Sequence, residues 1–228
     1  MSGSLTIEEM LELTADGEER LFKAPIQGAK EERFAAIQFN SDYIFPLEWN
    51  EGIDPLEAPC MATRRRKSIS LSVLPEPQIC STSKISQMVD FYRQGIGIFF
   101  VSNRLMDVME KLDPGSVECR PVVVQAADGA VDYNLVLPLR QLDAVDLERT
   151  DVLISGEWWN SSWLKRERFP HNVVFKKAEL EGIHNFNDIT IRNWFWSREL
   201  IDAAKAAGVK GPRFRLPGNN IIVDFERL

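Results

Sequence analysis

Cysteine and histidine are scarce in this sequence of 228 residues, which contains three cysteines and two histidines. Cys60, Cys80 and Cys119 include no CxxC or CxxH pair, and three thiols cannot form a complete disulfide framework. We therefore expect free thiols, as in proteins of a reducing compartment. We expect neither a metal site nor a cofactor.

Long apolar runs are also lacking. No stretch approaches the roughly 18 consecutive apolar residues that span a bilayer, and the N-terminus MSGSLTIEEM lacks the basic start and apolar run of a signal peptide. These features predict a cytoplasmic protein with no membrane partner. The hydrophobic share of 44% and the charged share of 27% are typical of a globular chain that buries a core.

Motifs of common enzyme classes are missing too: the chain has no GxSxG, HExxH, GxGxxG or P-loop. His171 and His184 could pair with Asp188 or Glu181 as a general base and its orienting partner. The pattern favours two ordinary surface or edge histidines instead, so we expect no catalytic residues.

Acidic residues are concentrated at one end of the chain. Residues 1–60 hold thirteen Asp and Glu against four Lys and Arg, a balance of −9, whereas residues 61–228 balance at +2. This distribution indicates a basic partner rather than nucleic acid; an acidic surface that serves solubility alone is the alternative. The basic run at 64–67 is interpreted as a solvated strand entrance.

The residues predict an α+β fold: a mostly antiparallel twisted sheet flanked by helices, with an irregular N-terminal segment. The expected helices are 8–13, 84–93 and 102–112 and one that ends before Gly208, which should cap it at positive φ. Prolines and a glycine predict a loop at 46–59. The expected strands are 34–39, 68–74, 96–101, 122–125, 131–137, 152–155, 173–177, 189–194 and 221–225.

One internal similarity links FFVSNRLMDVMEKL (99–112) and WFWSRELIDAAKAA (194–207) at a constant offset of 95. Ser102 and Ser197 each precede a helical stripe, so both segments are predicted to be strand–Ser–helix units. They could reflect a duplication, but a common strand-to-helix junction is the preferred interpretation.

Tryptophans gather in two places. Trp194 and Trp196 share one face of a predicted strand and are expected in the core. Trp158 and Trp159 point to opposite sides if extended, so one of them should approach the surface and could serve an interface.

The order of motifs resembles the immunity proteins of bacterial polymorphic toxin systems, specifically the family numbered eleven. Gly208, Gly211 and Phe214 fit the family's Gly-x-x-Gly-x-x-Phe turn, whereas Cys119 and Thr150 depart mildly from its pattern. The resemblance covers residues 68–217. It divides the chain into an acidic N-terminal segment (1–67) and a family-like core (68–228). It is carried by Asp90-Phe91, VSNRLMDVME (101–110), LDPGSVECRPV (112–122), the Asp128-Gly129 turn, AVDLERT (144–150), FKKAEL (175–180) and SRELIDAAKAAGVKGPRFRLP (197–217).

This resemblance implies that the chain neutralises a cognate protein toxin, often one delivered by contact-dependent or type VI secretion. Such toxins are frequently nucleases with basic surfaces, which suits an acidic inhibitor. The predicted toxin-binding residues are Glu48, Trp49, Glu51, Asp54, Glu57, Trp158 and Trp159. Two alternatives stay open: a ligand-binding or enzymatic module around Trp158, Trp159 and His171, and an adaptor that escorts a secreted effector.

Overall fold

The structure is a computed structural model that describes residues 5–13, 20–23, 25–26, 32–38, 47–48, 70–73, 78–94, 98–155, 166–189, 193–216 and 222–224. Its strands form three sheets, accompanied by helices α1 (Ile7–Glu12), α3 (Asn103–Leu112) and α4 (Arg198–Ala206). The predicted α+β class, dominated by antiparallel strands, is confirmed. Among the described residues, no helix is long and apolar enough to cross a membrane.

The first six-stranded sheet is built around a long hairpin of β7 (Val117–Ala126) and β8 (Gly129–Pro138). The predicted turn at Asp128-Gly129 is confirmed, and Gly129 has a positive φ of 153°. Both strands extend beyond their predicted limits. The full order is β3 (Leu47–Glu48), β4 (Gln78–Cys80), β7, β8, β6 (Ile98–Ser102) and β5 (Phe91–Gln94).

The second six-stranded sheet brings together distant parts of the chain. β2 (Phe34–Gln38) lies between β13 and β14, and its Ala35 and Ala36 are fully buried. Their small side chains leave room for the aromatic residues of the neighbouring strands. The full order is β15 (Ile222–Asp224), β14 (Arg213–Arg215), β2, β13 (Trp194–Ser197), β12 (Asn185–Asp188) and β9 (Gln141–Leu142).

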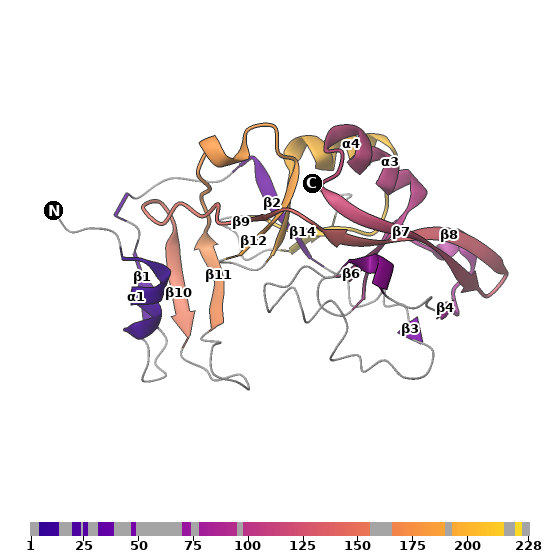
Figure 1. Ribbon diagram of the computed structural model, residues 1–228, viewed down its shortest axis with the longest axis horizontal. Coiled ribbons are helices and arrows are strands. Elements are labelled where there is room, and N and C mark those ends of the chain that lie inside the picture. The colour runs from indigo at the N-terminus through magenta and orange to yellow at the C-terminus, as the bar shows by residue number, and fades with distance from the viewer. Residues whose placement is uncertain are drawn as a thin grey trace.

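A small third sheet lies at one end of the molecule, beside α1, while the β7–β8 hairpin reaches the other end (Figure 1). Its strands are β1 (Arg20–Phe22), β10 (Asp151–Ser155) and β11 (Arg166–Asn172), and both pairings are antiparallel. Met10 of α1 and Val152 of β10 are buried together, with Phe22 packed against them.

The two strand–Ser–helix segments are larger than predicted, because each is a β-hairpin followed by a helix. β5, β6 and α3 form one unit, and β12, β13 and α4 form the other. Phe91 pairs with Val101 in the first hairpin and Asn185 pairs with Trp196 in the second. The second strands therefore match at the offset of 95 but the first strands match at 94, and this difference of one residue gives no support to a duplication over a common junction.

The two units share one hydrophobic core. Leu105 of α3 and Leu200 of α4, which match at the offset of 95, are both fully buried there, and the two helices pack against each other. Trp194 and Trp196 lie in the same core, 5.4 Å apart between ring centroids, as predicted. The opposite faces of the hairpins enter two separate cores, one containing Phe100 and the other Phe195.

Two predicted elements in the first half are wrong. The strand predicted at 68–74 is replaced by a 3-10 turn, Leu71–Val73, because the carboxylate of Glu118 accepts hydrogen bonds from the Leu71 N–H and the Ser70 hydroxyl. The helix predicted at 84–93 is a 3-10 turn, Ile85–Gln87, followed by β5. The backbone N–H and C=O groups that would have bonded within a helix instead form hydrogen bonds between β5 and β6.

Two predicted strands in the second half are also wrong. Residues 173–177 are buried at Val173, Val174 and Phe175 but form only an isolated bridge between Phe175 and Val145. The strand predicted at 189–194 overlaps β13 only at Trp194; Ile189 and Asn193 lie in no strand, and residues 190–192 lie outside the described residues. The predictions that are confirmed, within a few residues at each end, are helices 8–13 and 102–112, strands 34–39, 96–101, 152–155 and 221–225, and the cap at Gly208 (φ 72°).

Candidate functional site

The acidic segment at 46–59 begins at the edge of the first six-stranded sheet. β3 contains Leu47 and Glu48, and its backbone pairs with β4 through Leu47–Ile79 and Glu48–Gln78. The other predicted binding residues of this segment, Trp49, Glu51, Asp54 and Glu57, lie outside the described residues. The segment therefore starts from a sheet edge.

The second predicted contact, Trp158 and Trp159, also lies outside the described residues. In the sequence these tryptophans fall between β10 and β11, the two strands that continue the small sheet from β1. His171 belongs to β11. Cys60 also lies outside the described residues, whereas Cys80 and Cys119 are free thiols with exposed side chains.

His184 is the one histidine whose side-chain contacts are described. Its Nδ1 lies 3.0 Å from Ser197 Oγ and 3.2 Å from Glu199 Oε2. A serine–histidine–acid relay places the serine and the acid on opposite ring nitrogens, but here both lie at Nδ1. Ser197 Oγ also accepts the Leu200 N–H at 3.1 Å, so this cluster holds the N-terminus of α4. The predicted alternative partner, Asp188, instead accepts the Ala144 N–H.

A buried carboxylate, Asp113, links the two large sheets. It follows α3 and accepts hydrogen bonds from Arg140 at 2.7 Å and from the backbone N–H groups of His184 and Asn185 at 2.8 and 2.9 Å. Burial alone would raise the pKa of Asp113. The Arg140 hydrogen bond, the two backbone N–H groups and the Arg140 charge together lower it by more, so the pKa lies below the usual value. These partners occupy the carboxylate, which therefore serves the fold.

No group of three or more metal-ligating side chains occurs in the part of the chain that the structure describes. The described polar clusters, at Asp113 and at the helix N-termini, are already engaged in hydrogen bonds within the protein.

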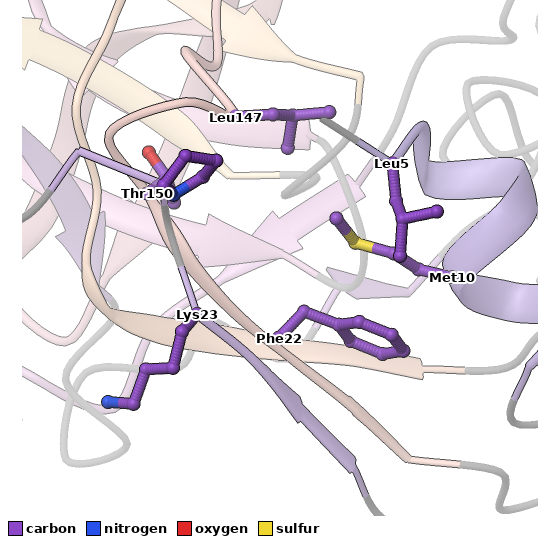
Figure 2. A pocket seen from close by; sticks show the side chains of 7 residues that line it. Leu5, Met10, Phe22, Lys23, Leu147 and Thr150 are labelled. Carbon is purple, nitrogen blue, oxygen red and sulfur yellow. The ribbon is translucent and has the colours of Figure 1, made fainter. Parts of the chain in front are cut away.

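The described surface has a cavity of about 180 Å³ between α1, β1 and the turn before β10. Leu5 and Met10 reach it from the α1 side, Phe22 from β1 and Leu147 from the opposite wall, while the Lys23 ammonium points away (Figure 2). The remaining lining residues are Pro25 and Thr150.

Local hydrogen bonds fix the walls of this cavity. The Thr6 N–H donates to Glu9 Oε2 at 2.7 Å and the Glu9 N–H donates to Thr6 Oγ1 at 3.2 Å, a reciprocal pair that caps the N-terminus of α1. The Ile26 N–H donates to the Glu148 carbonyl at 2.8 Å, which ties the chain after β1 to the turn. Sequence analysis found the helix but missed the cavity, although the Thr-x-x-Glu pattern marks where the helix begins.

The described residues before residue 34 carry four exposed large apolar side chains, of which Leu5 lines the cavity. Leu5, Leu13, Leu21 and Ile26 are between 38% and 47% exposed. Acidic side chains accompany them: Glu9 and Glu12 on α1 are exposed, as is Glu148 in the turn. This end of the molecule therefore combines an apolar hollow with negative charge.

The comparison with known families identifies the class of protein. The model of the Immunity protein family (Imm11) matches residues 34–218. This match covers most of the chain, and the chain therefore belongs to that family, which points to a role in toxin immunity. No curated protein matches the sequence.

The family match is longer than the resemblance predicted from the sequence. It begins at residue 34, where β2 starts, rather than at residue 68. The acidic segment 46–59 therefore lies within the family region. The elements that lie outside it at the N-terminus are α1 and β1, which form one side of the cavity.

Proposed function

We propose that this protein is an immunity protein that binds a cognate bacterial toxin directly and blocks its activity. The observation that carries the proposal is the family match across residues 34–218. In this proposal the protein acts as a stoichiometric binder and contributes no catalytic group.

The charge distribution supports a basic toxin as the partner. The balance of −9 across residues 1–60 creates an acidic end on a chain whose remainder balances at +2. Complementary charge accelerates association, which favours an inhibitor that must engage its toxin before damage occurs. Nucleases bind phosphate through basic surfaces, so a secreted nuclease is the proposed target and the cytoplasm the proposed place of encounter.

We assign the long-range attraction to the acidic segment 46–59, with Glu48, Glu51, Asp54 and Glu57 as the charged residues and Trp49 as an apolar contact. The start of this segment at the β3 sheet edge supports the assignment. Trp158 and Trp159 are proposed as a second contact, because the strands before and after them in the sequence, β10 and β11, belong to the same sheet as β1.

The test uses the candidate toxin domain, which is sought first in the gene immediately upstream of this one. Its expression should stop growth, and co-expression of the present chain should restore it. Purified chain should also bind a catalytically inactivated form of that domain. Binding without rescue would replace the proposal with an effector adaptor, and absence of both would contradict it.

A further inference from the structure

We propose that the cavity between α1, β1 and the turn at 147–150 receives an apolar side chain from a basic surface of the cognate toxin. This inference rests on the proposed function and names an anchor point for it. The cavity lies at the end of the molecule formed by the small sheet and α1 (Figures 1 and 2).

The size and lining of the cavity suit one apolar side chain. Its volume is about 180 Å³, and its walls include Leu5, Met10, Phe22 and Leu147. The hollow is open to solvent on one side, and its volume has room for one Phe or Leu side chain. Met10 is only 5% exposed and packs against the buried Val152, so the floor is formed before any partner arrives.

The surroundings of the cavity favour a protein partner. Half of the large apolar side chains that are exposed in the described residues belong to the short stretch 5–26, although that stretch is a small part of the chain. Exposed apolar groups that share a surface mark interaction sites, and Leu5 is both exposed and part of the cavity wall. An anchor residue that fills such a cavity concentrates binding free energy at an interface.

Charge selects among possible partners. Glu9 and Glu12 on α1 and Glu148 in the turn are exposed on two of the elements that form the cavity, and the exposed Arg149 pairs with Asp146 at 3.6 Å. The nearby cation Lys23 forms an ion pair with Asp151 at 3.1 Å. A second copy of this chain would bring like charges together at this surface, whereas a basic toxin would pair with them.

The boundary of the family match supports a partner-specific role. Leu5, Met10, Phe22 and Pro25 precede residue 34, whereas Leu147 and Thr150 lie within the matched region. One wall of the cavity therefore lies within the family region and the other lies before it. A wall outside the family region is a suitable place for residues that fit one particular toxin.

The test compares two variants that place a lysine at apolar positions of nearly equal exposure. Leu5 lines the cavity and is 38% exposed, whereas Ile189 follows β12, is 39% exposed and belongs neither to the cavity lining nor to the acidic segment. Binding of the inactivated toxin domain is measured for wild type, Leu5→Lys and Ile189→Lys, with the melting temperature of each as the folding check. Leu5→Lys should raise Kd by about tenfold or more, mainly through faster dissociation, and Ile189→Lys should stay within about twofold.

Amide hydrogen exchange of the wild-type complex provides a readout that needs no variant: residues 5–26 should gain protection when the toxin domain binds. Unchanged affinity of Leu5→Lys together with unchanged exchange at 5–26 would overturn the inference. A toxin-free dimer of the wild type that Leu5→Lys converts to monomer, without loss of toxin binding, would also overturn it, because a second copy then covers the cavity. Failure of the wild type to bind at all would instead contradict the proposed function.

Discussion

Asp90 and His184 occupy equivalent positions in the two hairpin–helix units. Each residue immediately precedes the first strand of its hairpin, and its carbonyl accepts the N–H of the serine that caps the following helix, at 2.9 Å for Ser102 and 2.8 Å for Ser197. The side chains then hydrogen-bond to the same two serine hydroxyls. One structural device therefore positions both helices, with a carboxylate in one unit and an imidazole in the other.

The two capping serines, Ser102 and Ser197, should contribute differently to the free energy of unfolding. Both serine hydroxyls accept a backbone N–H from their helix, but Ser102 also donates to the Asp90 carboxylate, which is largely buried. We expect Ser197→Ala to cost about 1 kcal/mol and Ser102→Ala to cost about 2 kcal/mol, because the carboxylate loses a donor. Urea denaturation measures both, with the exposed Ser86→Ala as the control; equal costs would show that Asp90 adds nothing.

Asp113 should make the free energy of unfolding depend on pH in the acidic range. Its pKa is lowered in the folded state, so its contribution is present above the unfolded value of about 3.9 and is lost as pH falls through the folded pKa. Asp113→Asn should cost on the order of 3 kcal/mol at neutral pH, because Arg140 loses its buried partner. The difference from wild type should shrink below about pH 4.

Denaturation curves at pH 7 and at about pH 3 test this expectation. The control is Asp107→Asn, the same change at an exposed position on α3, which should stay within about 0.5 kcal/mol of wild type at neutral pH. A constant difference between wild type and Asp113→Asn across this pH range would contradict the role assigned to the carboxylate.

Two glycines after α4 should respond differently to the same substitution. Gly208 has φ 72° and an added Cβ would lie 3.9 Å from its nearest neighbour, so Gly208→Ala should cost about 1 kcal/mol from backbone strain alone. Gly211 has φ 102°, and an added Cβ would lie 2.7 Å from Val89 Cβ. Gly211→Ala should cost a further 1 kcal/mol or more from overpacking. Thermal denaturation compares the two, and a smaller effect at Gly211 would show that Val89 moves freely.

The acidic segment should control how fast the toxin binds. Combined Glu48→Gln, Glu51→Gln and Asp54→Asn should lower the association rate at low salt and weaken its salt dependence, with less change in dissociation. The matched control removes three exposed acids from the two helices, through Asp107→Asn, Glu110→Gln and Asp202→Asn. Stopped-flow binding measures both variants; equal rates for the segment variant and wild type would remove this segment from the interface.

Local patterns predicted those elements whose capping and packing are also local. Ser102 and Ser197 stand directly before helical stripes, and Asp128-Gly129 stands between alternating strands, so each signal lies within a few residues of the structure it sets. The helix expected at 84–93 failed because its apolar spacing also suits a strand with a 3-10 turn before it. The backbone of Asp90 bonds to Lys210, which lies 120 residues away, and no local pattern reveals such a partner.

The candidate binding surface was harder to predict for the same reason. The cavity joins residues 5–26 to residues 147–150 through β1–β10 pairing and the Ile26–Glu148 hydrogen bond. Each of these stretches is short and unremarkable in the sequence. The acidic bias of the N-terminal third was visible, whereas the apolar hollow beside it emerges only when the chain is folded.

The most direct test of the central claim is a titration of toxin activity with purified immunity protein. The toxin domain is held at a concentration well above Kd, and its activity is measured as the immunity protein is added. Neutralisation by direct binding predicts a linear fall to zero at one equivalent, with no dependence on incubation time after the complex has formed. Continued loss of activity at a small fraction of an equivalent would indicate catalytic inactivation, and full activity beyond one equivalent would show that this chain does not inhibit the toxin.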